Sequence, residues 1–588
     1  MKDSVNCNCT HTLSNDVEYK EVVVIGNGPS GLVTSFMLAG NVPHLKQIPD
    51  DLPIDDMLKA RLSNLPVGQN LYETDLLQLA EGLEGRSQNP LPLLMDNLLR
   101  PCADLGIQAD PLIEWKYDVE KQISHIVLGR GPPGGAWHGF PAAVRTLSPS
   151  SWLTLPPHSA HSGDRLPASA LADYYRRYVR ATKLKRFFRS GVVVTSVRCV
   201  RARAAPCSAA CPRAAAFCVA GYDKTEGRPF RYVCGRVVLA CGAGDRPGTL
   251  APAAAKYCLH SLADLQAALA AEPASPHPVV VVGSGVSAAD AVRLARRARV
   301  LHVHRAPAAA LARLSPRAYP DYCQVYKMMC DGENGNYPNY KSYPNHVIVD
   351  VTPEEAPPPT DPRRDPTLRP KRVKLLNLVT NEVTEVIVSI ITVLIGSKPD
   401  LFFLQTNFNL NCIELDSDCI KCTEMQAKKK IEAERRQCFL REHWHYLKSV
   451  LGQSIQSCKS RYLNYTEING NTDGKCVLPD CIKRNESKCT CNNLISKSEN
   501  EVNNTVEDDK VICECPANNS SGVGFGVDPK KPVDSRNPIA VDKSTHELIN
   551  APKGLYALGP LTADNFVRFI PGGALAIVAH IHKEKFTR

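Results

Sequence analysis

Several features that define other classes of protein are absent from this sequence. Its 588 residues contain no apolar run of about 18 residues, the length that a membrane-spanning helix needs. The opening stretch MKDSVNCNCTHTLSNDVEYK lacks the apolar core of an export signal. The net charge is +10, but no compact Lys/Arg block with interleaved aromatic residues stands out, so nucleic-acid binding is not indicated. These absences predict a cytoplasmic protein without a membrane span.

Cysteine is plentiful, but its spacing is not typical of a metal site. The chain has 23 cysteines. Cys419 and Cys422 have a common zinc spacing, but no matching second pair follows at a usual interval. Because no export signal is present, we expect most thiols to be reduced rather than paired. The sequence therefore predicts no metal site.

Two segments combine a β-branched run, a glycine-rich loop and a helical stretch. The first reads VVVIGNGPSGLVTSFMLAG, and its residues 22–25 are predicted to form a buried strand. Gly26 allows a tight turn, Gly28 lets the backbone approach a pyrophosphate, and Gly31 lets the next helix pack closely. The start of that helix, which includes Ser30, offers free N–H groups to phosphates. The alternative is an ordinary strand–turn–helix without a ligand.

The second segment reads VVVVGSGVSAADAVRLARRA and repeats this arrangement. Residues 279–282 are predicted to form the strand, and Gly283, Ser284 and Gly285 the turn. Ala288 replaces the third glycine, a change that nicotinamide-binding loops tolerate. Two such loops predict two dinucleotides, most simply a nicotinamide that passes electrons to a flavin.

Arg305 follows the next predicted strand, residues 300–304. A ribose-binding acid usually lies about 20 residues beyond such a loop, whereas an Arg there accommodates a 2′-phosphate. Arg305 therefore favours NADPH over NADH. The alternatives are a solvated surface role for Arg305, or use of one of the preceding arginines, namely Arg293, Arg296, Arg297 and Arg299.

A further glycine-rich segment follows the strand predicted at residues 125–129. It reads RGPPGGAWHGF, and a GGxW sequence after a strand is a second cofactor contact in flavin proteins. Gly134 and Gly135 admit the cofactor closely, and Trp137 covers it.

The carboxy-terminal segment GLYALGPLTADNFVRFIPGGALAIVAHI is predicted to form a strand, a small-residue turn and a helix. The helix is expected to begin near Gly572, where its amino terminus would stabilise negative charge on a reduced flavin. Asp564 and Asn565 are candidates to hold the ribityl chain. The alternative for Asp564 is a helix or turn cap.

These patterns predict an α/β protein with two Rossmann-like dinucleotide-binding domains. The FAD-binding domain is discontinuous, with the NADPH-binding domain inserted into it. A long low-order insertion, rich in Cys and Asn and poor in large apolar residues, interrupts the second half. The predicted boundaries are 1–18 for a disordered tail, 19–250 for the first part of the FAD-binding domain (with a helical insertion at 41–120), 251–404 for the NADPH-binding domain, 405–536 for the low-order insertion and 537–588 for the closing segment.

Together these motifs resemble the oxidative stress-induced growth inhibitor family, which is itself similar to flavin-containing monooxygenases. The resemblance rests on GNGPSG, EGLEGRSQNP, VLGRGPPGGAWH, VVVVGSGVSAADAV, AYPDYCQVYKMMC, VLIGSKPDL and ALGPLTADNFVRFIPGGALAI. It covers most of residues 19–404 and 537–588, but not 405–536. It implies FAD, NADPH, a monooxygenase-type activity, and a role in restraining growth under oxidative stress and in cell division.

The chain departs from the monooxygenase pattern at several positions. An acid for the ribose of the flavin nucleotide, an Asn beside the flavin and an Asp after the final turn are replaced by Leu128, Ser148 and Pro560. In the FxGxxxH segment that should precede His260, Ala254 and Lys256 stand at the Phe and Gly positions. These departures bear on oxygenation more than on flavin binding.

The sequence therefore predicts an FAD-dependent, NADPH-using, monooxygenase-like oxidoreductase with a small-molecule substrate and regulatory protein partners. No Ser/His/Asp constellation or other catalytic group is identified. The alternative is a non-catalytic regulatory protein on a flavoprotein scaffold, because fold alone does not establish activity. A third reading, a cysteine-based disulfide reductase, predicts a CxxC near the flavin, and neither dinucleotide segment contains one.

Overall fold

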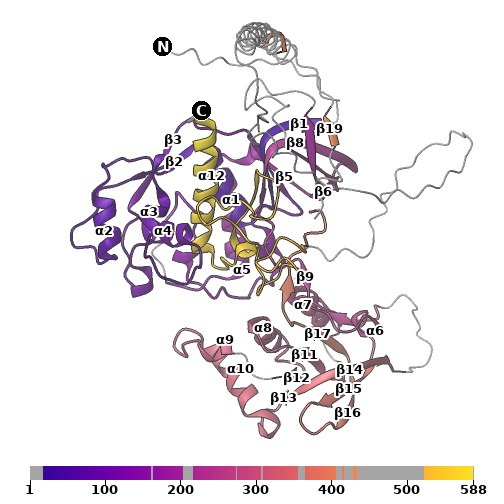
Figure 1. Ribbon diagram of the computed structural model, residues 1–588. Helices are drawn as coiled ribbons and strands as arrows, with labels where there is room; N and C mark the ends of the chain where they lie inside the picture. Colours follow the sequence, from indigo (N-terminus) through magenta and orange to yellow (C-terminus); the bar gives the residue numbers. More distant parts are fainter. Residues whose placement is uncertain are drawn as a thin grey trace, which may run out of the picture. The chain divides into compact units, whose positions relative to one another are not determined.

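The computed structural model describes residues 17–159, 163–202, 216–272, 275–305, 309–354, 365–404, 413–415, 428, 430–432 and 522–586 (Figure 1). One compact unit comprises Met1–Cys422 and Ser520–Arg588, and the other is Thr423–Asn519. Nearly all of the described residues belong to the first unit, which is a mixed α/β structure with parallel strands, as predicted. The predicted tail up to residue 16 and most of the predicted insertion lie outside the described residues.

The first sheet has eight strands, and its parallel part is built around β1 (Val17–Ile25). β1 pairs with β4 (His125–Gly129) on one side and β8 (Arg228–Leu239) on the other, and β8 also pairs with β20 (Leu555–Ala557). β5 (Phe188–Ser190) extends the sheet beyond β4. The last strand of the chain therefore lies in the same sheet as the first.

The rest of this sheet is largely antiparallel. β6 (Val192–Ala202), β7 (Phe217–Asp223) and β8 form a meander, and β19 (Ile413–Leu415) pairs with β6 at the edge.

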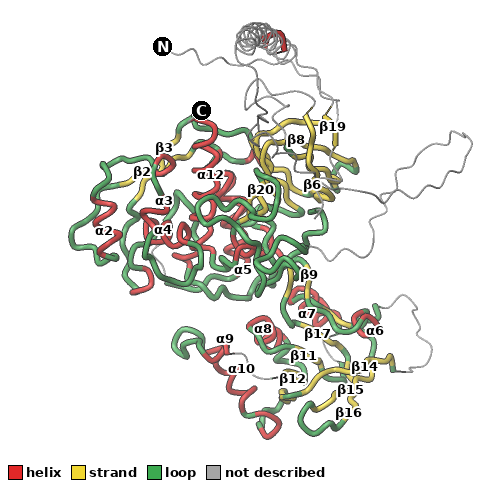
Figure 2. Tube along the Cα trace, in the orientation of Figure 1, coloured by secondary structure: helices red, strands yellow, loops and turns green. Residues whose placement is uncertain are grey.

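Both faces of β1 are covered, which explains why its buried residues form a continuous β-branched run. Val22 and Val24 face a core that contains α1 (Pro29–Leu38), α4 (Pro90–Leu99), α5 (Ala168–Ala181) and α12 (Ile570–Phe586). Val23 and Ile25 face a second core of β6–β8 side chains, because successive residues of a strand point to opposite faces. Figure 2 shows the helices gathered to one side of the strands of this sheet.

The segment at residues 41–120, predicted as a helical insertion, has three short α-helices separated by loops. It contains α2 (Asp56–Ser63), α3 (Leu76–Ala80) and α4, and its leucines join the first core. Its two ends form an antiparallel strand pair, β2 (Asn41–Leu45) and β3 (Ile113–Tyr117), which the leucine spacing does not indicate.

Residues 522–536, which the sequence analysis assigned to the low-order insertion, are described in the structure. Phe525 and Val533 are buried in the second core. Asn537 donates hydrogen bonds from Nδ2 to the carbonyls of Asp528, Lys531 and Pro532, and so fixes the connecting turn. Isolated apolar residues in a Gly-, Asp- and Pro-rich stretch give no periodic signal.

The second sheet has five parallel strands centred on β11 (Val279–Val282). Its order is β10 (Cys258–Leu259), β17 (Ile390–Val393), β11, β12 (Val300–His304) and β13 (Tyr340–Pro344). A separate antiparallel sheet contains β14 (His346–Pro353), β15 (Lys371–Asn377) and β16 (Val383–Val388). β9 (Arg246–Pro247) and β18 (Ser397–Lys398) pair where the chain leaves the first sheet and later returns toward it.

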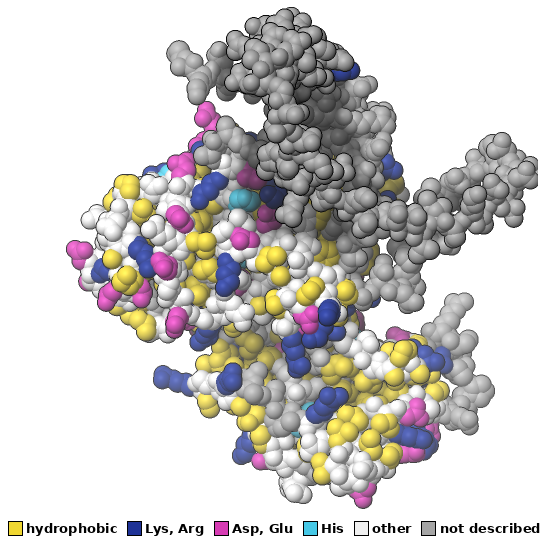
Figure 3. Space-filling model, viewed as in Figure 1, with side chains coloured by type: hydrophobic (Ala, Val, Ile, Leu, Met, Phe, Trp, Pro, Cys, Tyr) yellow, Lys and Arg dark blue, Asp and Glu magenta, His cyan; other side chains and the backbone are white. Residues whose placement is uncertain are grey.

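Surface charge is dispersed on the face drawn in Figure 3, where Lys and Arg side chains stand among acidic and apolar ones. Among the described residues, no helix combines the length and apolar character that crossing a membrane requires.

Candidate functional site

The first glycine loop joins β1 to α1, as predicted, and two of its glycines are required by packing. Gly26 has a φ of +114°, and a Cβ there would lie 2.3 Å from the Ala240 carbonyl oxygen. A Cβ on Gly31 would lie 2.0 Å from the Gly26 carbonyl oxygen. Because neither glycine has a Cβ, α1 can lie close to the end of β1.

Gly28 is different, because no described residue requires a glycine there. Its φ of −74° and ψ of −171° are extended backbone that any residue adopts, and a Cβ would meet no atom within 4 Å. Gly28 is the N-cap of α1 and makes no side-chain cap to the first free N–H groups. The open space therefore lies at a helix amino terminus, where phosphates bind.

The GPPGGAW segment lies against this loop, although about a hundred residues separate them in sequence. The Gly134 amide donates to the Asn27 carbonyl at 2.9 Å, and Asn27 Nδ2 donates to the Gly131 carbonyl at 2.6 Å. A Cβ on Gly135 would lie 3.0 Å from Gly28 Cα. Trp137 is half-buried against the first core. The structure thus brings together two segments that the sequence predicts to contact one cofactor.

The turn after β20 completes this arrangement. Gly559 has a φ of +71°, and a Cβ there would lie 2.5 Å from Ser30 Oγ on α1. Leu128, which stands where an acid was expected, is buried opposite Ile25 in the sheet. Arg130 follows β4 and lies 3.7 Å from Asp245 and 3.6 Å from Asp400. A positively charged side chain therefore lies at this end of the strand.

Asp564 lies near this turn, and its carboxylate already has protein partners. Its side chain is 2% exposed and accepts hydrogen bonds from Ser87 Oγ at 2.5 Å and Asn89 Nδ2 at 2.9 Å. Burial raises the pKa of Asp564 to about 6. Asp564 therefore anchors the closing segment to the EGRSQNP stretch, which explains that motif. Asn565 is exposed and donates to the Ala563 carbonyl at 3.3 Å.

The final helix begins earlier than predicted. α12 starts at Ile570 rather than near Gly572, because Pro571 is well suited to the first turn of a helix. A Cβ on Gly572 would lie 2.3 Å from the Leu91 carbonyl oxygen, so this glycine allows α12 to pack against the first turn of α4.

The second glycine loop, between β11 and α8 (Val286–Leu294), repeats the pattern of the first. Gly283 has a φ of +136°, and a Cβ there would lie 2.3 Å from the Leu394 carbonyl oxygen. Ala288 is fully buried behind it, and Ser284 is half-buried. Gly285 has a φ of −84° and a ψ of −175°, and a Cβ there would meet no atom within 4 Å. This loop also leaves open space at a helix amino terminus.

β12 places Arg305 at its exposed end and carries two buried histidines that the sequence analysis did not identify. His302 Nε2 donates to the Gly283 carbonyl at 2.7 Å, and His304 lies 3.0 Å from Ser342 Oγ. Burial lowers the pKa of His302 to about 3 and that of His304 to about 4, so both are neutral. The signal available in the sequence was polar residues at alternate positions of a buried strand.

The AYPDYCQVYKMMC stretch forms α10 (Pro320–Cys330) and holds α8 in place. Tyr322 Oη donates to Asp290 on α8 at 3.0 Å. Arg165 stacks on the Tyr322 ring at 5.2 Å and lies 3.3 Å from Asp321. This motif therefore fixes the position of α8, the helix that follows the second glycine loop.

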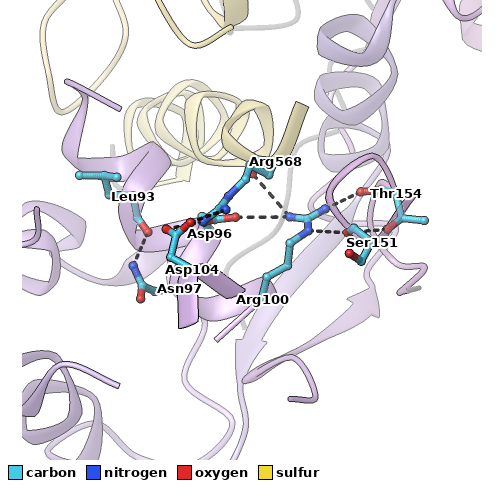
Figure 4. Close-up of polar contacts among 8 residues, drawn as sticks. All are labelled: Leu93, Asp96, Asn97, Arg100, Asp104, Ser151, Thr154 and Arg568. Carbon is cyan, nitrogen blue, oxygen red and sulfur yellow. Dashed lines mark hydrogen bonds and ion pairs between the residues drawn. The ribbon is translucent and has the colours of Figure 1, made fainter. Parts of the chain in front are cut away.

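A buried ionic cluster fastens the closing segment to the insertion (Figure 4). Arg568 is 3% exposed, donates from Nε to Asp96 at 2.8 Å, and makes two 2.9 Å hydrogen bonds to Asp104. Its guanidinium lies 4.3 Å from the centre of the Trp152 ring. Arg100 donates to the carbonyls of Ser151 and Thr154. The cluster joins α4, the loop at residues 149–154 and the residues that precede α12.

Among the described residues, no group of three or more His, Cys, Asp or Glu side chains is arranged to hold a metal ion.

These features define a mixed α/β protein in which two strand–glycine loop–helix units lie on separate sheets. No family model matches the sequence. The chain is 30% identical over 593 residues to oxidative stress-induced growth inhibitor 1 of Mus musculus, across 96% of this chain and 95% of the mouse protein. The chain therefore belongs to the oxidative stress-induced growth inhibitor family. The match covers 96% of the chain and therefore includes most of residues 405–536. The resemblance based on motifs alone did not extend to those residues.

Solved structures resemble the chain more distantly. A bacillithiol disulfide reductase from Bacillus cereus is 15% identical with a TM-score of 0.39, over 68% of this chain and 90% of its own. An ornithine hydroxylase from Pseudomonas aeruginosa is 10% identical with a TM-score of 0.38, over 66% of this chain and 84% of its own.

We expect Arg568→Met to lower the free energy of unfolding by about 3 to 5 kcal/mol, because it leaves Asp96 buried without its partner. Lys116→Met, which breaks the half-exposed pair with Glu114, should cost far less, because solvent screens that pair. Urea unfolding of both variants measures the difference. Equal losses would show that the Arg568 cluster is not a structural anchor.

The raised pKa of Asp564 predicts a pH dependence of stability. An unfolded Asp has a pKa of about 3.9, so between that pH and about 6 the folded chain binds the proton more tightly. The contribution of Asp564 to the free energy of unfolding therefore rises as pH falls from 7 to 4, by up to about 3 kcal/mol. Asp564→Asn should lose this increment, while Asp173→Asn, at a half-exposed side chain, should keep it. Thermal unfolding at pH 7 and 5 tests this; identical pH profiles for Asp564→Asn and the unaltered chain would contradict it.

Proposed function

We propose that the chain is an FAD-dependent oxidoreductase of the monooxygenase type that uses NADPH and restrains growth under oxidative stress. The observation that carries this proposal is the open space at Gly28 and Gly285. Both glycines have ordinary backbone angles and no neighbour that excludes a side chain. A ligand that needs close backbone approach, such as a pyrophosphate, explains glycine at both positions.

The surroundings of each loop favour a different dinucleotide. Gly134, Gly135 and the turn at Gly559 all lie against the first loop. Three segments therefore surround the open space there, which suits the larger FAD. In the second, Arg305 stands exposed at the end of β12, where it can pair with a 2′-phosphate. We assign FAD to the first loop and NADPH to the second, in two Rossmann-like domains.

The residues near the first loop bind and orient rather than react. The amino terminus of α1 holds the pyrophosphate, and the glycines at 134 and 135 admit the cofactor. Bound FAD supplies the redox chemistry, including reaction with oxygen. The name of the mouse relative supports a role in growth restraint under oxidative stress. We infer a small-molecule substrate and place the protein in the cytoplasm, with regulatory proteins as further partners.

A non-catalytic regulatory role is the second candidate, because specific positions favour it. Leu128 gives the flavin ribose no acid, and Pro560 stands where an Asp is usual in monooxygenases. A protein with these replacements can retain flavin for structure or redox sensing. The two candidates differ in whether NADPH is consumed.

We expect Gly28→Val to lower flavin affinity by at least about tenfold, because the new side chain fills the space that the phosphates need. Stability should be nearly unchanged, since that space holds no protein atom. Gly31→Ala should instead destabilise the fold, because its Cβ would meet the Gly26 carbonyl oxygen. Flavin content and thermal unfolding of the two variants distinguish these effects. Full flavin occupancy in Gly28→Val would exclude a phosphate at this loop.

The decisive test is the visible spectrum of the purified protein before and after NADPH is added in air. We expect a flavin spectrum that bleaches and then recovers. Gly285→Val should keep the flavin spectrum but lose the bleaching, and Arg305→Ala should weaken the preference for NADPH over NADH. A flavin spectrum that NADPH leaves unchanged would favour the regulatory role, and loss of flavin from Gly285→Val would overturn the two-site assignment.

A further inference from the structure

A separate cavity of about 640 Å³ opens beside the ionic cluster. Its walls come from the end of α4, the loop at residues 101–111, β3 and residues 149–159. The glycines of the two loops do not line it. Cavities of about 300 to 1,000 Å³ are typical of small-molecule sites. The volume is therefore sufficient for a ligand distinct from the dinucleotides.

The lining of this cavity is mixed, and part of it is apolar. Leu99, Ile113, Trp115 and Trp152 line it, and Ile113 is buried in the first core. Ile107 also lines it and is 43% exposed, and Leu105 close by is 67% exposed. Two indole rings supply large apolar surfaces that suit a hydrocarbon chain or a ring. The ligand that fits has an apolar body.

One charged group that lines the cavity is Arg100, which shares the Asp96 carboxylate with Arg568. Its side chain is 12% exposed and donates to the Ser151 carbonyl at 2.9 Å and the Thr154 carbonyl at 2.6 Å (Figure 4). Its nearest carboxylate oxygen, Asp96 Oδ1, is 3.7 Å away, beyond hydrogen-bond distance. The other Asp96 oxygen is bound by Arg568. The hydrogen bonds of Arg100 therefore go mainly to backbone carbonyls, and its ion pair with Asp96 is a long one.

Lys46 adds a second positive charge at the edge of the cavity. Its Nζ donates one hydrogen bond, to the Pro111 carbonyl at 3.0 Å. Two acidic residues also line the cavity, but Glu114 is paired with Lys116 at 2.7 Å and Asp110 lies on the exposed rim. An anionic group placed between Arg100 and Lys46 would be stabilised by both cations.

We propose that this cavity binds an amphipathic carboxylate, with its apolar body between Trp115 and Trp152 and its carboxylate directed to Arg100 and Lys46. This site does not depend on the proposed redox chemistry, because its walls contain neither glycine loop. Arg100 also lies 3.5 Å from the Arg568 carbonyl.

Isothermal titration of the full-length protein with three ten-carbon probes, without NADPH, tests the proposal. The probes are decanoate, decan-1-ol and decylammonium, which share an apolar body and differ in head-group charge. We expect decanoate to bind at least about tenfold more tightly than decanol, and decylammonium to bind most weakly, because a hydrogen bond to a charged group favours the anion. Equal affinities, tightest binding of decylammonium, or no binding of decanoate would overturn the proposal.

Two variants locate the binding. Lys46→Gln should weaken decanoate about two- to fivefold, while Lys224→Gln, at an exposed turn away from the cavity, should leave it unchanged. Ala109→Trp should abolish binding by filling the mouth of the cavity, and an unchanged unfolding temperature without ligand shows that it is folded. Full decanoate affinity in Ala109→Trp would place the ligand elsewhere and overturn the assignment.

Discussion

The pairing of Arg568 with Asp96 is the interaction on which the packing of the carboxy-terminal segment against α4 depends. A guanidinium and a carboxylate that are both buried tolerate only one arrangement, since removal of either leaves a charge without water or a partner. This requirement fixes the residues that precede α12 against α4. α12 can then lie beside α1 and α4, and β20 can join the sheet that begins with β1.

Glycines in this protein serve two physical purposes, and the structure separates them. Gly26, Gly31 and Gly283 are enclosed by backbone atoms that leave no room for a Cβ. Gly28 and Gly285 are free of such contacts and adopt ordinary angles. The first group explains how each helix lies close to its strand. For the second group, the described part of the chain offers no packing reason, which is why these glycines support the proposal of a ligand at each loop.

Buried polar groups hold these loops in position from outside the motifs. His302 binds the Gly283 carbonyl, and Ser87 and Asn89 bind Asp564 beside the turn that contacts Ser30. A buried polar group must be satisfied by a specific partner, so each of these contacts restricts the fold to one arrangement. Arg100, which lines the cavity, is held in the same way, because its guanidinium donates to two backbone carbonyls.

Local sequence by itself determined the central strands and the two glycine loops, because β-branched runs and glycine spacing act over a few residues. Residues 125–129, 279–282 and 300–304 form the strands that were predicted. Only the tertiary structure decided what lies beside them: the pairing of β2 with β3, the packing of residues 522–536, the start of α12 at Ile570 and the partners of Asp564. These depend on contacts between residues far apart in the chain, where one carboxylate or one apolar side chain leaves no periodic pattern to detect.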